Sequence, residues 1–227
     1  TLNCTNRTIL INRDTLTECT GTNISCVQSN NATVTITYNS MNQTQAFTNN
    51  NFGQTGIHVA NAVASNMNLR IQYNRIRKMR NGIWVSRVNG AKITDNPAID
   101  FLAGQPTSTT NPCIGIKLEE AHNALVRMNV ISFPNTPSQP IHDEIFGLHI
   151  TNCVNDTIVK NSFTRLGSAV FLKGTCNPAL LACNNLTQCY YDFNFNYLNS
   201  FGSGVSLNDQ ITWGGPTAYY TTGNVFS

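Results

Sequence analysis

The chain has 227 residues, a net charge of +3 and only 11% charged residues, against roughly a quarter in typical domains. A charge this small and scattered does not suggest a nucleic-acid or anionic-membrane partner, so we predict no nucleic acid among its partners, and no apolar run approaches the ~18 residues needed for direct membrane insertion. The polar residues are mostly uncharged, asparagine and threonine foremost, and this composition predicts a secreted or cell-surface protein.

Residues 1–50 differ in composition and residue pattern from the rest of the chain. They hold three of the eight cysteines and an alternating run over residues 32–38. They contain too few large apolar residues to bury a core of their own. We therefore predict an irregular, cysteine-containing N-terminal cap or first coil over 1–50, followed by one elongated domain over 51–227 that is truncated at its C-terminal end.

From Gly56 onward one short phrase recurs: a glycine, an apolar residue, any residue, an apolar residue, and then an asparagine at a set distance. Three copies begin at Gly82, Gly115 and Gly147 and place asparagines at 96, 129 and 161, each 14 residues downstream. Looser copies begin at 56, 169 and 204 and lead to asparagines 74, 196 and 224. A repeat of about 20–35 residues is typical of stacked arrays, in which each coil packs only on its neighbours.

The alternation inside each phrase predicts strands of four or five residues with one buried face. Because such short strands are unstable alone, we expect each coil to lay its strand on the preceding one in a parallel sheet. We expect the glycine to supply the backbone shape of the turn into the strand. We expect the asparagine to adopt left-handed backbone angles and to bond to the amide one coil away.

The predicted fold class is therefore all-β, a parallel β-helix solenoid of about six or more coils with long loop insertions at 100–112 and 174–189. The alternative is ordinary antiparallel strands separated by asparagine-rich loops. Such a sandwich does not need a fixed glycine-to-asparagine offset.

Residues 56–227 resemble the right-handed parallel β-helix proteins of the pectate-lyase-like superfamily. The likeness rests on the three glycine/asparagine pairs and on segments such as NGIWVSRVNGAKITDN. The resemblance implies the fold and says little about activity, since lyases, hydrolases, epimerases, phage tailspikes and adhesins share such coils. For an enzyme, it implies clustered acidic residues that bind calcium in the lyases, or paired aspartates in the hydrolases.

An even number of cysteines in a chain of low charge favours disulfides and an oxidising compartment. The candidates are Cys4, Cys19, Cys26, Cys113, Cys153, Cys176, Cys183 and Cys189. We expect Cys113 and Cys153 to meet, because they flank strands of adjacent coils, and we expect one local bridge within the loop at 174–189. No Cys-x-x-Cys pair occurs and the histidines lie elsewhere, so we predict no metal site and no cofactor, with calcium left open.

The middle residue of each phrase should point outward, and successive coils should place these residues in a file about 4.8 Å apart. This file, with the outward position two residues further on, contains the predicted ligand-binding residues His58, Trp84, Lys117, His149, Phe171 and Lys173. Aromatic rings suit the faces of sugars, while histidine and lysine can bind hydroxyls or carboxylates. The alternative role for Trp84 and Phe171 is to pack down the long loops.

Catalytic residues are weakly indicated, because the acids are few and dispersed. The candidates are Glu119, Glu120, His142, Asp143 and Glu144. The last three lie in a phrase similar to the Asp-Pro-His-Glu phrase of the β-helix alginate epimerases, but in the wrong order, and a solvated turn is the alternative. The Asn-x-Asp, Asp-Asp and Arg-Ile-Lys phrases of the β-helix polygalacturonases are absent.

A basic run follows Leu69. It comprises Arg70, Arg75, Arg77, Lys78 and Arg80. Such a run suits either an anionic polysaccharide or the solvated corner of a coil.

Three functions remain open. The favoured one is an extracellular, adhesin-type binding module that recognises a glycan or a surface protein through the exposed face of its parallel sheet. The alternatives are a polysaccharide lyase or glycoside hydrolase, and a passive spacer. Because the chain begins without methionine and ends within what reads as a coil, we expect it to be part of a longer polypeptide.

Overall fold

The computed structural model describes residues 2–3, 6–17, 21–27, 31–43, 55–101, 112–134, 144–176, 180–196 and 225–226. All regular secondary structure in these ranges is β-strand. None of the described residues forms a helix long and apolar enough to cross a membrane.

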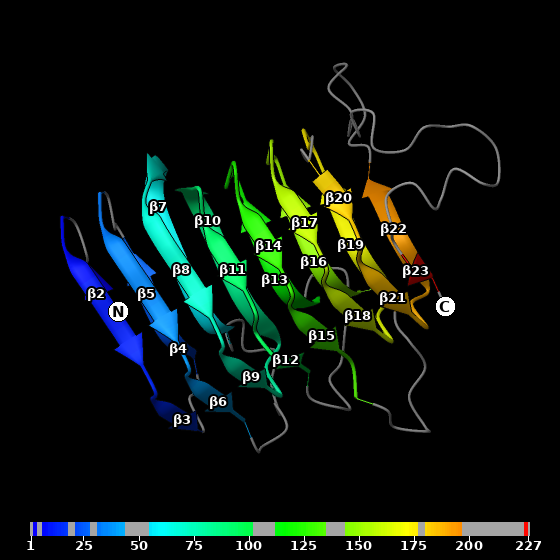
Figure 1. Ribbon diagram of the computed structural model, residues 1–227, viewed down its shortest axis with the longest axis horizontal. Helices are drawn as coiled ribbons and strands as arrows, with labels where there is room; N and C mark the ends of the chain where they lie inside the picture. The colour runs from blue at the N-terminus through cyan, green and yellow to red at the C-terminus, as the bar shows by residue number, and fades with distance from the viewer. Residues whose placement is uncertain are drawn as a thin grey trace.

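The strands form three parallel sheets, here called A, B and C, which run along the molecule (Figure 1). Sheet A contains β1 (Leu2–Asn3), β4 (Thr22–Val27), β7 (Thr55–Asn66), β10 (Asn81–Asn89), β13 (Cys113–Glu119), β16 (Ile145–Thr151), β19 (Ser168–Lys173) and β22 (Tyr191–Asn196). Sheet B contains β2 (Thr8–Asn12), β5 (Thr33–Thr37), β8 (Asn68–Gln72), β11 (Lys92–Thr94), β14 (Leu125–Arg127), β17 (Thr157–Val159) and β20 (Leu180–Ala182). Sheet C contains β3 (Thr15–Thr17), β6 (Ser40–Asn42), β9 (Arg75–Arg77), β12 (Ala98–Asp100), β15 (Val130–Ser132), β18 (Ser162–Thr164), β21 (Asn185–Thr187) and β23 (Val225–Phe226).

Neighbouring strands in each sheet come from consecutive coils, so the chain visits the three sheets in turn. The protein is therefore an all-β parallel β-helix, as predicted, and the antiparallel alternative is wrong. Equivalent side chains stack along the core: Ile57, Ile83, Ile116, Leu148 and Val170 are register partners on sheet A and all are fully buried. Each strand thus buries its apolar side chains against those of the adjacent coils, which makes three-residue strands stable.

A ladder of buried asparagines holds the turn between sheets B and C. Its members are Asn39, Asn74, Asn96, Asn129, Asn161 and Asn184. From Asn74 onward, each Oδ1 accepts hydrogen bonds from the backbone N–H and the Nδ2 of the asparagine one coil earlier. Each Nδ2 also donates to a backbone carbonyl of the preceding coil. The predicted amide stacking is confirmed.

The left-handed residue of this turn is the one before each ladder asparagine, and in the described coils it is neither glycine nor asparagine. The residues are Tyr38, Tyr73, Asp95, Met128, Lys160 and Cys183, with φ between 55° and 59°. The expectation that the ladder asparagines themselves take left-handed angles is wrong. Their side chains fix the turn from inside, and the strain falls on the preceding residue, whose type the ladder does not restrict.

The repeated glycines serve close packing rather than turn geometry. Gly82, Gly115 and Gly147 do not have left-handed φ angles, so the predicted backbone role is wrong. A Cβ on Gly115 would lie 2.6 Å from the carbonyl oxygen of Gly147 and 2.6 Å from Cγ2 of Ile131. Only glycine lets sheet A approach the side chains of sheet C this closely.

The end of the repeat differs from its prediction. Residues 174–189 are not a loop insertion, because they contain β20 and β21. The ladder asparagine of this coil is Asn184, 15 residues after Ala169 (184 − 169), whereas Asn196 ends β22. At the other end, β2 to β6 already supply all three sheets. The predicted boundary near residue 50, residues 102–111 of the predicted loop at 100–112, and the copy beginning at 204 lie outside the described residues.

Candidate functional site

The outward residues of sheet A form the predicted file. Trp84 is the register partner of His58 and of Lys117, and His149 is the partner of Lys117 and of Phe171. Lys173 stands in the adjacent outward file. The structure therefore brings the six predicted ligand-binding residues onto one face, here called the sheet A face.

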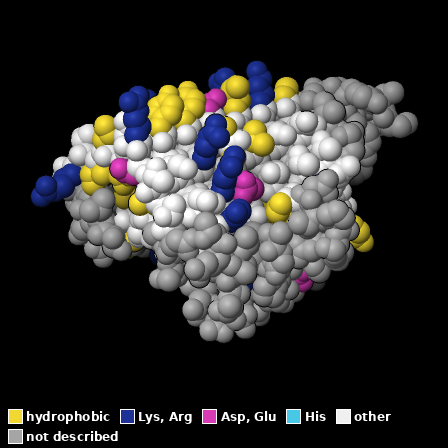
Figure 2. Space-filling view, turned by 90° about the horizontal axis from the view of Figure 1, so that it is seen from below, with side chains coloured by type: hydrophobic (Ala, Val, Ile, Leu, Met, Phe, Trp, Pro, Cys, Tyr) yellow, Lys and Arg dark blue, Asp and Glu magenta, His cyan; other side chains and the backbone are white. Residues whose placement is uncertain are grey.

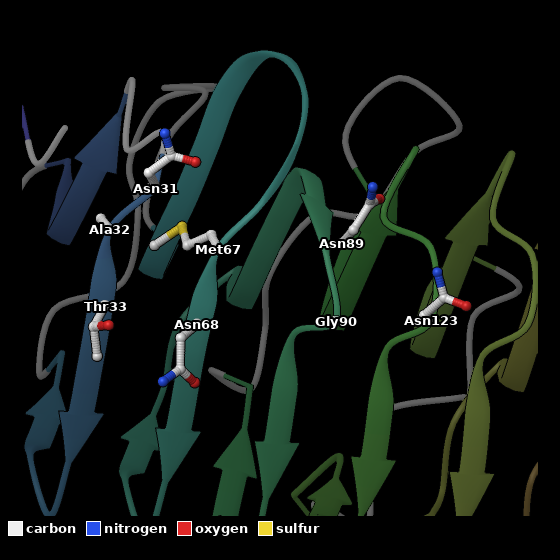
Figure 3. Close-up of a pocket in the computed structure, with 8 residues that line it drawn as sticks. All are labelled: Asn31, Ala32, Thr33, Met67, Asn68, Asn89, Gly90 and Asn123. Carbon is white, nitrogen blue, oxygen red and sulfur yellow. The ribbon is translucent and has the colours of Figure 1, made fainter. Parts of the chain in front are cut away.

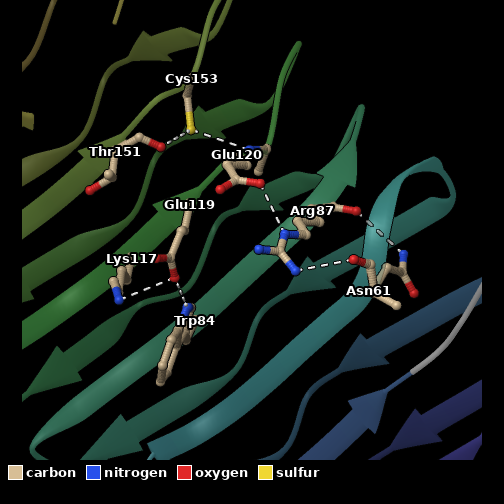
Figure 4. Close-up of polar contacts among 10 residues, drawn as sticks. Asn61, Trp84, Arg87, Lys117, Glu119, Glu120, Thr151 and Cys153 are labelled. Atoms are coloured by element: carbon tan, nitrogen blue, oxygen red, sulfur yellow. Dashed lines mark hydrogen bonds and ion pairs between the residues drawn. The ribbon is translucent and has the colours of Figure 1, made fainter. Parts of the chain in front are cut away.

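Trp84 is the centre of a tightly contacted group on this face (Figure 4). Its ring centroid lies 4.8 Å from that of His58, and Nζ of Lys117 lies 4.1 Å from the indole centroid. The indole N–H donates to Oε2 of Glu119 at 3.2 Å, and the same oxygen lies 3.2 Å from Nζ of Lys117. Glu119 thus orients the indole plane and holds the lysine cation against it, an arrangement stabilised by the cation–π attraction.

A second aromatic group lies two and three coils further along, on β16 and β19. The ring of Phe171 meets that of His149 edge-on at 4.8 Å and that of Phe146 at 4.8 Å. Phe171 is 8% exposed, so it is largely covered. Sequence reasoning missed Phe146, because the position before each glycine was not read as part of the face, although Phe146 pairs in register with Ile114 and Ser168.

Both histidines of the file are neutral at neutral pH. Burial lowers the pKa of His149 to about 4, with help from the charges of Lys117 and Lys173. Burial and Lys117 also lower the pKa of His58, and Glu119 opposes this in part. His149 Nε2 lies 3.3 Å from Oγ1 of Thr151, while its buried Nδ1 has no hydrogen-bond partner among the described residues. Of the six predicted residues, Lys117 and Lys173 therefore carry the positive charge.

The candidate catalytic acids are not brought together. Glu119 is engaged by Lys117 and Trp84, while Glu120 lies in the turn after β13 and pairs with Nε of Arg87 at 2.9 Å. Glu144 precedes β16, at the opposite end of the strands, roughly 20 Å from Glu119 by strand length. His142 and Asp143 lie outside the described residues. Among the described acids, no two free carboxylates therefore face each other on sheet A.

The predicted basic run is also divided. Arg70, Arg75, Arg77 and Lys78 are exposed on sheets B and C, but Arg80 is buried beside the start of sheet A. Arg80 therefore does not belong to the surface that the run forms.

The predicted cysteine pairings are wrong. Cys113 lies beside Ile145 at the start of β16 and Cys153 follows the end of that strand, roughly 20 Å away. Cys113, Cys153, Cys176 and Cys189 are in no disulfide, and burial raises the pKa of Cys113 to about 12 and of Cys189 to about 11. The local bridge at 174–189 is not formed either, because its three cysteines occupy three different corners of one coil. Cys26 is buried in β4, Cys183 is exposed, and Cys4 and Cys19 lie outside the described residues.

A buried carboxyl lies close to two of these thiols. Oδ1 of Asp156 accepts the backbone N–H of Ala124 at 2.8 Å, and Oδ2 has no hydrogen-bond partner in the described part of the chain. Burial raises the pKa of Asp156 to about 7, and its charge raises the pKa of Cys153 further than burial alone does. No three His, Cys, Asp or Glu side chains of the described ranges are placed to hold a metal ion.

An open hollow of about 620 Å³ lies at the turns between sheets A and B (Figure 3). It is lined mainly by asparagines, with Asn31, Asn68, Asn89 and Asn123 around Met67. No predicted site residue lines it, and its amides provide hydrogen bonds without charge.

The fold and the sheet A face define the protein as a parallel β-helix with an aromatic and cationic file along one sheet. Comparison with protein-family models, with curated proteins and with solved structures finds no match to this chain.

Proposed function

We propose that the sheet A face binds a glycan, in an adhesin-type module of a secreted or cell-surface protein. The observation that supports this most is the arrangement of Trp84, Lys117 and Glu119. The indole is held by a hydrogen bond to Glu119 and by the lysine at 4.1 Å, so little conformational freedom is lost when a ligand binds. Preorganised aromatic side chains are typical anchors of binding surfaces.

The polar neighbours of the file complete the proposed site. Ser86, Glu119, Thr151 and Lys173 form the adjacent outward file and stand one coil apart. Their hydroxyl, carboxylate and ammonium groups can bond to sugar hydroxyls while the rings of His58, Trp84 and His149 contact the apolar parts of the sugar. A chain of sugars would then lie along the solenoid axis.

The test is a glycan array probed with the wild-type protein and with Trp84→Ala. We expect the variant to lose at least about tenfold in affinity for the glycans that the wild type retains, as for the loss of an interface anchor. Tyr190→Ala is the matched control, because Tyr190 is an exposed aromatic residue outside the file. Equal binding by wild type and Trp84→Ala, with both proteins folded by circular dichroism, would refute the proposal.

A polysaccharide lyase or hydrolase of the pectate-lyase-like kind is the second candidate. It is favoured by one observation, the contact of Lys117 with Glu119, which places an ammonium group able to donate a proton beside a carboxylate. Incubation with acidic and neutral polysaccharides, followed by ultraviolet absorbance of unsaturated products and by reducing ends, tests for turnover. If the wild type turned over a polysaccharide and Glu119→Gln did not, the protein would be an enzyme rather than a binding module. A passive spacer would be inert in both experiments.

The extracellular setting rests on composition. With 11% charged residues, the surface is polar but nearly uncharged. Detection of the mature protein in culture medium or on intact cells by antibody would support this setting, and confinement to the cell interior would exclude it.

A further inference from the structure

We propose that one coil carries a second binding surface, for a glycan that bears sulfate or phosphate esters. The surface consists of the outward side chains Arg70, Tyr73, Arg75, Arg77 and Lys78, here called the basic belt. It wraps the corner between sheets B and C, whereas the proposed glycan site lies on sheet A.

The cations of the belt are presented by regular structure. Arg70 points outward from β8 between buried Leu69 and Ile71, and Arg75 and Arg77 point outward from β9 on either side of buried Ile76. The next residue, Lys78, is also exposed. In the view from below, Lys and Arg side chains cluster across a face that is otherwise mostly uncharged (Figure 2).

The charge of the belt is poorly compensated. Lys92 is the register partner of Arg70 on the next coil, so two like charges stand side by side, which a sheet avoids at a cost in stability. Asp100 lies 3.8 Å from Nε of Arg77, but its other oxygen accepts the backbone N–H of Lys78. Asp95, on the turn of the next coil, is the only other acid between residues 55 and 101. Five cations thus face two carboxylates, although the whole chain carries only +3.

Tyr73 places an aromatic ring in the middle of the belt. It stacks on Tyr38 of the preceding coil, with ring centroids 4.8 Å apart and planes 16° apart. Both tyrosines have left-handed backbones, and they are 42% and 55% exposed. The left-handed angle recurs at this turn in the other described coils, so the distinctive feature here is the pair of large exposed aromatic rings, which is characteristic of binding sites.

The residue types indicate the ligand. Arg75 and Arg77 stand on the same face of β9, roughly 7 Å apart, so two guanidinium groups can converge on one anion. A sulfate or phosphate ester offers three oxygens to such donors, more than a carboxylate does. The stacked tyrosines supply a flat contact for the sugar ring that carries the ester.

The test measures binding to heparin as the sulfated probe and to a phosphorylated mannan as the phosphorylated probe, in low salt. We expect Arg75→Gln/Arg77→Gln to lower affinity for at least one of these probes by at least about tenfold, and added salt to weaken wild-type binding. Arg7→Gln/Lys160→Asn is the matched control, because it also removes two positive charges, but from exposed sites on other coils. Trp84→Ala should bind like the wild type, which separates this surface from the sheet A face.

Several results would overturn the proposal. They are an equal loss in the control pair, no loss in the belt pair, or no binding of the wild type to either probe. Binding of polygalacturonate as tight as that of heparin would show that carboxylates suffice. Equally tight binding of single-stranded DNA would assign the belt to nucleic acid instead.

Discussion

Asn129 and Asn96 lie one coil apart, and the Oδ1 of Asn129 accepts two hydrogen bonds from Asn96, at 3.3 Å from its backbone N–H and 2.7 Å from its Nδ2. The Nδ2 of Asn129 in turn donates to the carbonyl of Ile93 and to Oδ1 of Asn161. All of these groups are shielded from water, so each bond replaces hydration that the folded protein cannot supply. The ladder is therefore a continuous chain of hydrogen bonds that connects the turns of successive coils along the solenoid.

Replacement of Asn129 by alanine should destabilise the protein strongly. The change removes the acceptor of two buried hydrogen bonds from Asn96 and the side-chain donor to the carbonyl of Ile93, and we expect the free energy of unfolding to fall by roughly 3–5 kcal/mol. Urea unfolding followed by circular dichroism measures this. Asn68→Ala, an exposed asparagine on β8, should change it by less than about 0.5 kcal/mol. Similar midpoints for the two variants would contradict the structural role of the ladder.

Two glycine substitutions should separate close packing from backbone strain. Gly115→Ala forces a Cβ to within 2.6 Å of a neighbouring carbonyl and of Ile131, and we expect a loss of roughly 2–4 kcal/mol. Gly90 has a φ of +72°, and a methyl group added there would meet no atom within 4 Å, so Gly90→Ala should cost only about 1 kcal/mol, from the backbone angle. Thermal or urea unfolding would contradict this account if Gly90→Ala were the less stable of the two.

His149 should make the protein less stable in acid. Its pKa falls from an ordinary 6.5 to about 4 on folding, so the unfolded chain binds the proton first as pH decreases. Stability is fully present above pH 6.5 and is lost between there and pH 4, by an amount on the order of 3 kcal/mol. In His149→Gln the urea midpoint should depend less on pH over this window. An unchanged pH profile in the variant would show that His149 is not the titrating group.

Asp156 should have the opposite effect. Its pKa rises from an ordinary 3.8 to about 7 on folding, so the folded protein retains the proton longer than the unfolded chain. The contribution to stability is fully present below pH 3.8, decreases as pH rises through 7, and is constant above that. Asp156→Asn should remove this decrease and should be most stabilising, relative to the wild type, at about pH 8. Urea midpoints across the range from mildly acidic to mildly alkaline pH measure the effect, and parallel profiles for the two proteins would contradict it.

The predictions about the turns and the last coil that the structure corrected failed for a common physical reason. The 14-residue spacing from Gly115 to Asn129 could be read from the chain because a coil repeats both residues in the same place. The left-handed angle of Met128 carried no such signal, because the ladder fixes the turn whatever residue precedes it. The short strands β20 and β21 were missed because three-residue strands, each with few buried side chains, resemble a polar loop in sequence.

The amino-acid sequence by itself determined the parallel solenoid and the file from His58 to Phe171, because equivalent positions on stacked coils must lie above one another. Only the tertiary structure decided what these side chains do to each other: that Glu119 engages both Trp84 and Lys117, that His149 is half-buried and neutral, and that Cys113 and Cys153 lie apart. Those outcomes depend on distances of a few ångströms between side chains on neighbouring coils, and on burial by those coils, neither of which a periodic pattern encodes.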